Sequence, residues 1–335
     1  MKPIYCFIAL LIWAPSLFAE PPQRILLIET MPVEAVIEPS RHFVEELRAR
    51  GWTPERLSIQ KFQAQGSRER AKDMVLQEIR KQKPDLVVTV ATFAAQGAFE
   101  ALKKRNIPQL FFTVADPVGA GLVEQVGVPS GTNITGLVYT VPRSTKLKVM
   151  LPLLKQAYKS SPIRIGFIHT DYPSELDDMR RLKALEKEIP ELEFVFKEIK
   201  YHKVPEQVDQ MQAELRTALK SFKGTVDGFW APQGGLGQTR MYNQTVVEEG
   251  YVVIYAVNPQ SVQDGALLYL DPDYKATGHD AAFYAEQILK GKPAGELPVS
   301  YPTKFKLAVN LTTALKMGIV LPRNLLEMAG DNLYR

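Results

Sequence analysis

A repeated alternation of apolar, strand-length runs with helix-length segments most constrains the fold of this chain. It is clearest between Asp85 and Gly136, where the runs Leu86–Val90 and 110–114 flank a helix-like segment at 94–104. A strand–helix–strand unit of this kind builds a parallel sheet, and ligands of open α/β sheets bind at the carboxyl ends of the strands. The first candidates for a site are the residues that follow the two runs: Thr92, Phe93, Gln96 and Asp116.

The alternation extends over most of the chain. Further strands are predicted at residues 24–30, 57–62, 164–169, 194–199, 226–230, 252–256 and 266–270. Helices are predicted at residues 41–50, 68–82, 144–154, 176–188, 207–221, 239–249 and 276–289, with short ones near 312–317 and 322–329. Ser40 and Ser67 precede the first two of these helices, where serine is a preferred N-cap.

We therefore predict an α/β fold of two Rossmann-like lobes with parallel sheets, a plan that suits a chain of 335 residues. The predicted first lobe comprises residues 20–138 plus 272–302, and the second comprises 139–271 plus 303–335. The segments 136–142, 270–274 and 301–305 are the candidate crossings between the lobes. Three crossings make a hinge, and the cleft between the lobes faces the carboxyl-end loops of both sheets.

The N-terminus has the pattern of a cleavable secretory signal peptide over residues 1–19. Lys2 is followed by an apolar stretch that contains Cys6 and ends at Ala19, a small residue suited to cleavage. The alternative is a membrane anchor, but the stretch is interrupted by prolines and is shorter than the roughly 20 residues that a spanning helix needs. We expect a periplasmic or otherwise extracytoplasmic protein. Its mature chain would contain no cysteine, which excludes thiolate catalysis and thiolate metal sites.

Charge and motifs exclude several other classes of function. The 41 basic and 37 acidic residues are spread along the chain, without the basic run that is typical of a nucleic-acid binder. The glycine-rich segments at 119–121 and 234–239 lack the third glycine of a dinucleotide fingerprint and the lysine of a phosphate-binding loop. The four histidines have no metal-ligand spacing. We therefore expect no cofactor, no metal, no catalytic residue and no nucleic-acid partner.

Four segments carry a resemblance to a known family. They read A-T-F-A-A-Q at 91–96, D-P-V-G-A-G-L-V at 116–123, G-T-N-I-T-G-L-V at 131–138, and L-A-V-N-L-T-T-A-L-K-M-G-I-V-L-P-R-N-L-L at 307–326. Together they resemble the ABC-transporter substrate-binding proteins of the tryptophan/tyrosine-uptake type, over about residues 24–332. The resemblance implies a type I periplasmic binding protein fold, and a two-lobed receptor that delivers a small solute to a membrane permease powered by an ATPase.

The resemblance places the ligand in the cleft between the lobes. Thr92, Phe93 and Gln96 match the family's first loop, Asp116 its second, and the segment 171–174 its N-P-S-E-type loop. Gln233 and Gly234 stand where the family often has a Thr-Asp pair, and Asn258 stands near a common acidic loop. The predicted ligand-binding residues are Thr92, Phe93, Gln96, Asp116, Tyr139, Asp171, Tyr172, Ser174, Gln233, Gly234, Asn258 and Asp271.

The departures from the family pattern leave the ligand open. A ligand ammonium needs carboxylates or several carbonyl acceptors, because an unpaired buried charge is very costly. Asp116, Asp171 and Asp271 are its possible partners, and a ligand with fewer positive groups fits the amide-rich loops at least as well. Asp116 and the pair Gly234–Gly235 also suit a purely structural turn.

Three functional classes remain at this point. The first is a transport receptor, expected to act as a monomer. The second is a sensory subunit that presents its closed form to a membrane receptor, which the sequence does not separate from the first. The third is an exported enzyme, for which no nucleophile–base pair can be nominated.

Overall fold

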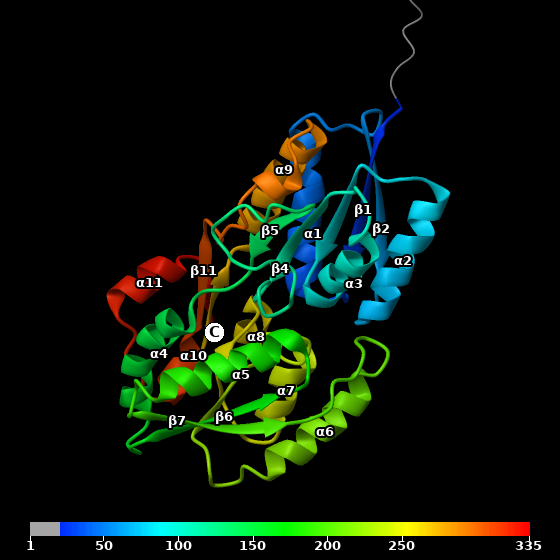
Figure 1. Cartoon of the computed structure of the whole chain (residues 1–335). Helices are drawn as coiled ribbons and strands as arrows, with labels where there is room; N and C mark the ends of the chain where they lie inside the picture. The colour runs from blue at the N-terminus through cyan, green and yellow to red at the C-terminus, as the bar shows by residue number, and fades with distance from the viewer. Residues whose placement is uncertain (1–20) are drawn as a thin grey trace, which may run out of the picture.

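The computed structural model describes residues 21–335, so the predicted signal peptide lies outside the described residues. Two α/β lobes, each built around its own sheet, lie one above the other in Figure 1. The predicted fold class is confirmed. Within residues 21–335, no helix combines the length and the apolar character that crossing a membrane would require.

The sheet of the first lobe is parallel and has the strand order β2-β1-β3-β4-β5. Its strands are β1 (Gln23–Glu29), β2 (Leu57–Gln63), β3 (Leu86–Val90), β4 (Gln109–Val114) and β5 (Ile134–Val138). Helices α1 (Glu34–Ala49) and α9 (Tyr274–Leu289) cover one face, and α2 (Arg68–Lys81) and α3 (Thr92–Leu102) cover the other (Figure 1).

Burial on both faces explains why the strands of this sheet are continuously apolar. In β1, Ile25 and Leu27 belong to the same core cluster as Phe43 of α1. Leu26 and Ile28 point the other way and pack with the residues of α2 and α3. Successive side chains of a strand alternate between its two faces, so a sheet that is covered twice needs apolar residues at every position.

The second sheet has the order β12-β11-β10-β9-β8-β6-β7, in which only the β10–β11 pair is antiparallel among the described strands. Its strands are β6 (Ile163–His169), β7 (Leu192–Glu198), β8 (Gly228–Trp230), β9 (Val253–Ala256), β10 (Leu268–Pro272), β11 (Phe305–Asn310) and β12 (Leu333–Tyr334). The helices of this lobe are α4 (Arg143–Ala157), α5 (Pro173–Glu186), α6 (Val208–Lys220), α7 (Arg240–Glu248), α8 (Pro259–Gln263), α10 (Leu311–Lys316) and α11 (Arg323–Ala329).

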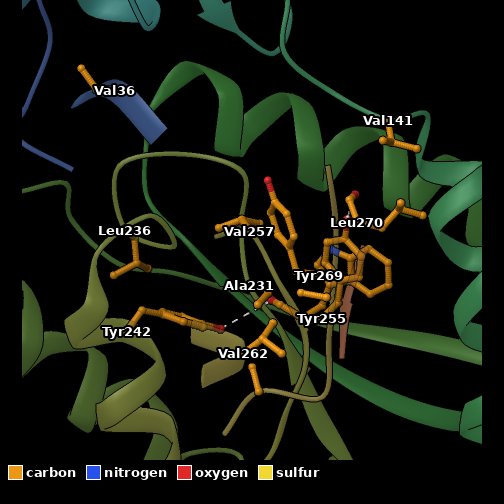
Figure 2. Close-up of a cluster of buried hydrophobic side chains, with 14 of the residues drawn as sticks. Val36, Val141, Ala231, Leu236, Tyr242, Tyr255, Val257, Val262, Tyr269 and Leu270 are labelled. Atoms are coloured by element: carbon orange, nitrogen blue, oxygen red, sulfur yellow. Dashed lines mark hydrogen bonds between the residues drawn. The ribbon is translucent and has the colours of Figure 1, made fainter. Parts of the chain in front are cut away.

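The chain passes between the two sheets after β5, after β10 and before β11. The last two passages lie side by side, because Pro272 at the end of β10 pairs with Phe305 at the start of β11. Between them the chain returns to the first lobe as α9. Large buried side chains of the second lobe gather beside these passages; Figure 2 shows Tyr255, Tyr269 and Leu270 packed together near Val141. The lobe boundaries themselves stay a prediction.

The start of the first helix was predicted wrongly. α1 begins at Glu34 instead of residue 41, and Ser40 is buried inside the helix instead of capping it. Pro39 hides this extension in the sequence because proline usually marks a helix start or break. Here the helix continues through it, and Ala35 and Val36 are buried on the same helix as Phe43 and Leu47. The Ser67 cap is confirmed: its side chain accepts a hydrogen bond from the Arg70 backbone N–H.

The returning helix α9 lies directly against the backbone of α1 at Gly278. A Cβ atom placed on Gly278 would lie 2.6 Å from the Pro39 carbonyl oxygen and 2.7 Å from the Phe43 backbone nitrogen. Real Cβ atoms do not approach so closely, so any side chain at this position would push the two helices apart. Glycine at 278 therefore allows the late segment to close the first lobe.

We predict that Gly278→Leu lowers the free energy of unfolding by more than about 2 kcal/mol, because overpacking strains a dense core. Lys275→Leu places the same side chain at an exposed position of α9 and is expected to stay within about 0.5 kcal/mol of the wild type. Urea unfolding of the two variants measures the difference. Equal stabilities would contradict the close packing of α1 on α9.

Candidate functional site

A cavity lies between the lobes, where the carboxyl-end loops of the two sheets meet. Its volume is about 40 Å³, enough for a few water molecules. Typical ligand pockets measure roughly 300–1,000 Å³, so the lobes enclose very little space here. The lining residues are Met31, Val33, Ala35, Val36, Ala91, Thr92, Thr113, Ala115, Tyr139, Tyr172, Ser174, Gln233, Gly234, Gly235 and Gln238.

Three aromatic rings join the lobes at the edge of this cavity. The Phe93 ring, from α3 of the first lobe, lies 4.3 Å from the Tyr172 ring and 5.6 Å from the Tyr201 ring, both of the second lobe. The centroids of the two tyrosine rings are 5.2 Å apart. Such aromatic pairs contribute about 0.5–1.5 kcal/mol each beyond their buried area. The contact helps to hold the lobes together.

The first turn of α3 faces the cavity in an unusual backbone conformation. Ala91, the N-cap residue, has φ 70° and ψ 171°, and its own side chain cannot cap the helix. The Ala94 N–H is satisfied by the Thr30 hydroxyl at 2.9 Å. Burial raises the pKa of the Tyr172 phenol, and Phe93 and Thr92 of this turn counteract part of the rise.

A second strained residue lines the same cavity. Thr113 has φ 59°, which is rare for a β-branched residue, and it lies where the pairing of β4 with β5 shifts register. Its hydroxyl oxygen is buried without a hydrogen-bond partner. Conformations like those of Ala91 and Thr113 cost of order 1–3 kcal/mol and concentrate at ligand-binding sites. Their occurrence together makes this cavity the candidate functional centre.

Glu175 fixes the wall that the second lobe contributes. One oxygen of its buried carboxylate accepts hydrogen bonds from the N–H and the hydroxyl of Thr170, at 2.7 and 2.9 Å. The other accepts from the Leu236 N–H at 2.6 Å. The side chain thereby ties the loop after β6 to the loop after β8, and it packs so closely under Gly234 that a Cβ there would lie 2.4 Å from its Cγ. Burial raises the pKa of Glu175 to about 7.

A buried ionic network holds Gln233 in the cavity wall. Lys146 donates hydrogen bonds to the Gln233 side-chain oxygen at 3.2 Å and to Asp271 at 2.9 Å. Asp178 accepts from the Gln233 N–H at 3.0 Å and from Arg143 at 2.8 Å. Burial lowers the pKa of Lys146 and raises that of Asp271, while the attraction between them acts in the opposite direction.

Half of the predicted site residues are brought together at the cavity: Thr92, Tyr139, Tyr172, Ser174, Gln233 and Gly234. Their role in ligand binding stays a prediction. Phe93 lies at the rim against Tyr172. Gln96 lies behind the first turn of α3 and donates to the Ala120 carbonyl oxygen at 2.9 Å.

The predicted acidic residues lie elsewhere. Asp116 borders a separate groove of about 620 Å³, where it accepts from the Gly119 N–H and lies 3.6 Å from Arg181. Asp171 lines an outer groove and accepts from the Tyr201 N–H. Asp271 is fully buried in its pair with Lys146. No acidic or basic side chain is among the residues that line the cavity in the described part of the chain.

Asn258 caps α8, a short helix that the sequence analysis missed. Its side chain accepts from the Ser261 N–H at 2.8 Å, and it borders a side chamber that shares Val33 and Gln238 with the cavity. His169, at the end of β6, has its Nδ1 3.0 Å from the Thr170 carbonyl oxygen. No hydrogen bond joins it to a serine or a carboxylate among the described residues.

Sequence reasoning missed the loop between β1 and α1, which contributes Met31 and Val33 to the cavity, and the first turn of α1, which contributes Ala35 and Val36. The rule that sites form at the carboxyl ends of strands would have found them, because they follow β1 directly. They were overlooked because the helix was predicted to start later. Thr113 and Gln238 were also missed. Thr113 lies within an apolar strand, where the sequence gives no sign of its positive φ.

Comparisons with known proteins agree with the two-lobed fold. The sequence model of the family described as ABC transporter substrate binding protein matches residues 33–333. A tyrosine-binding protein of Clostridioides difficile (strain R20291) is 28% identical over 232 residues, which cover 69% of this chain and 62% of the relative's length. The match thus spans less than two thirds of that relative.

Solved structures show the same fold. A domain in complex with L-Trp from Streptococcus pneumoniae has a TM-score of 0.77 at 20% identity, covering 94% of this chain and all of the other. A conserved domain protein from Vibrio cholerae O1 biovar El Tor has a TM-score of 0.76 at 23% identity, covering 93% of this chain and 99% of the other.

The backbone strain at Ala91 predicts that a glycine substitution, which usually destabilises a protein, increases stability at this position. Ala91→Gly is expected to raise the free energy of unfolding by about 1 kcal/mol, because the backbone conformation at 91 is essentially specific to glycine. Ala94→Gly, three residues further along the same helix, is the matched control and is expected to lower it by about 1 kcal/mol. Urea unfolding measures both. Destabilisation by Ala91→Gly would show that position 91 carries no strain.

Glu175 predicts how stability depends on pH. Folding raises the pKa of Glu175 from 4.5 to about 7. The contribution of its protonated form to the free energy of unfolding is therefore fully present below about pH 4.5 and is lost as the pH rises through 7. The full effect is up to about 3 kcal/mol. We expect Glu175→Gln to reduce the loss of stability between pH 5 and pH 8, measured by urea unfolding. Glu327→Gln, exposed on α11, should retain the wild-type difference; an unchanged difference in Glu175→Gln would contradict the raised pKa.

Proposed function

The chain belongs to the family of ABC transporter substrate-binding proteins and has the type I periplasmic binding protein fold. From this membership we propose that it captures a small organic solute between its lobes and delivers it to the membrane permease of an ABC transporter. The observation that carries the proposal is the cavity itself. Thr92 and Thr113 reach it from the first lobe and Ser174 and Gln233 from the second, so a solute placed there touches both. Such a solute favours the closed arrangement by its higher affinity for it.

We propose an aromatic amino acid or a related aromatic compound as the ligand. The relatives support this class, since one is named a tyrosine-binding protein and another was solved with L-Trp. The lining suits it as well: Met31, Val36 and Tyr139 offer apolar surface for a ring. With no acidic residue in the lining, a ligand ammonium would depend on oxygen acceptors such as those of Thr113 and Gln238. Aromatic carboxylates without an amino group are therefore included in the class.

The mature protein is proposed to act outside the cytoplasm, as a monomer and without a nucleic-acid partner, after removal of residues 1–19. Family membership supports the extracytoplasmic location. The pattern of Lys2, the apolar stretch and Ala19 supports cleavage. N-terminal sequencing of the protein recovered from the periplasm of an expressing cell tests this, and retention of Met1 would count against it.

Ligand binding is tested by titrating the mature protein with L-tryptophan, L-tyrosine and a wider panel of solutes while thermal unfolding is followed. A ligand present at 100 times its Kd is expected to stabilise the protein by about 2.7 kcal/mol. The absence of any shift across the panel would contradict the proposed function.

Thr92→Val is expected to weaken binding of the ligand so found about tenfold or more, because a lost hydrogen bond to a charged group costs about 1.5–3 kcal/mol. Asp171→Asn is the control: Asp171 lines the outer groove instead of the cavity, so the affinity should not change. Isothermal titration compares the two variants. Equal affinities in wild type and Thr92→Val would contradict a ligand contact with the first turn of α3.

A further inference from the structure

Two glutamine side chains reach the cavity from one loop, the loop that follows β8. They are Gln233 and Gln238. A side-chain amide can present its NH2 group, which donates, or its oxygen, which accepts, and the partner that holds one end determines which end is presented. No acidic or basic side chain within residues 21–335 lines the cavity, so the orientation of these amides matters for the polar groups of a ligand.

Lys146 fixes the orientation of the Gln233 amide. Its ammonium group donates to the Gln233 side-chain oxygen at 3.2 Å and to Asp271 at 2.9 Å. An ammonium group has three donors and no acceptor, so a rotated amide would turn its own donors toward those of Lys146 and lose this hydrogen bond. The Gln233 NH2 group makes no hydrogen bond within residues 21–335 and is available to donate to a ligand.

Val257 fixes the Gln238 amide in the opposite sense. The Gln238 NH2 group donates to the Val257 carbonyl oxygen at 2.9 Å. A carbonyl oxygen only accepts, so a rotated amide would bring two oxygens together. The Gln238 side-chain oxygen has no hydrogen-bond partner among the described residues. Gln238 therefore presents an acceptor, whereas Gln233 presents a donor.

A third amide near the cavity differs from these two. The Asn258 side-chain oxygen accepts from the Ser261 N–H at 2.8 Å, and its NH2 group donates to the Gly237 carbonyl oxygen at 3.4 Å. Both ends of this amide have partners within the chain, as is usual for buried polar groups. Gln233 and Gln238 each leave one end without such a partner, which suits a role in ligand recognition.

We infer that Gln233 and Gln238 select a ligand head group that carries both an acceptor and a donor: Gln233 donates to a carboxylate oxygen and Gln238 accepts from an ammonium N–H. The inference rests on the proposed function, which supplies the solute. A zwitterion suits a lining without charged side chains, because it brings no net charge that the protein would have to compensate.

The two orientations are set within one part of the molecule. Lys146 belongs to α4, Asp271 to β10, and Val257 follows β9, so the contacts that hold both amides come from elements around the second sheet. They do not depend on how far apart the two lobes lie. The same head group is therefore expected to be recognised before and after any movement of the lobes.

The test compares Gln233→Met and Gln238→Met, which remove one amide each and retain a side chain of similar length. L-Tryptophan carries both groups, indole-3-propionate lacks the ammonium and tryptamine lacks the carboxylate. Gln233→Met is expected to bind L-tryptophan and indole-3-propionate about tenfold more weakly or worse, and tryptamine within about twofold of the wild type. Gln238→Met should instead weaken L-tryptophan and tryptamine and spare indole-3-propionate. Isothermal titration of the mature protein measures these affinities.

Gln233→Glu serves if Gln233→Met does not fold. It retains an oxygen for Lys146 and presents a second oxygen to the cavity, so it should bind tryptamine more tightly and indole-3-propionate more weakly than the wild type does. Gln156→Met is the control, because Gln156 is an exposed glutamine of α4 that does not line the cavity. It should leave all three affinities unchanged.

The pattern across ligands separates the inference from the proposed function. If the variants at 233 and 238 weaken all three ligands to the same degree, or weaken none, the inference is wrong while the proposed function stands. If the wild type binds none of the three compounds, the inference is also wrong, and the proposed function then depends on the other solutes of the panel.

Discussion

The buried pair of Lys146 and Asp271 is the contact on which the arrangement of the lobes depends. The side chains are 3% and 0% exposed, and their charged atoms lie 2.8 Å apart. Lys146 follows the first passage between the lobes and Asp271 lies on β10 at the second. Asp271 also accepts from the Val141 N–H at 3.4 Å, so one carboxylate joins both passages. Removing one partner of such a pair leaves an uncompensated buried charge, which typically costs 3–5 kcal/mol.

The same pair connects the hinge to the binding wall, because Lys146 also holds the Gln233 side chain. The cavity is thus bordered by a buried ionic network on its hinge side, and by aromatic rings and an exposed ion pair on the side of α3. A receptor that opens and closes, as we propose, would need contacts of these two kinds. Exposed ion pairs are weak and easily broken, whereas breaking a buried pair is costly.

Much of this could be predicted from local patterns. The β3–α3–β4 unit and the Ser67 cap follow from apolar periodicity and from serine's preference for N-caps, and both are present. Contacts between distant segments could not be predicted. Lys146 and Asp271 are 125 residues apart in the chain, and nothing local marks Asp271 as a hinge residue instead of a ligand contact. Position 91 is similar: an alanine gives no sign in the sequence of a positive φ, which the surrounding structure imposes.

The return of α9 to the first lobe has a consequence for how the protein is made. The face of the first sheet that α9 covers includes Phe112 of β4, and only α1 covers this face until residues 274–289 have been synthesised. The first lobe cannot finish folding when its own strands are complete and must wait for most of the second. The order of the elements along the chain therefore delays the folding of this lobe during synthesis. For a chain that we propose is exported, this delay extends the period in which it can still pass through a translocation channel unfolded.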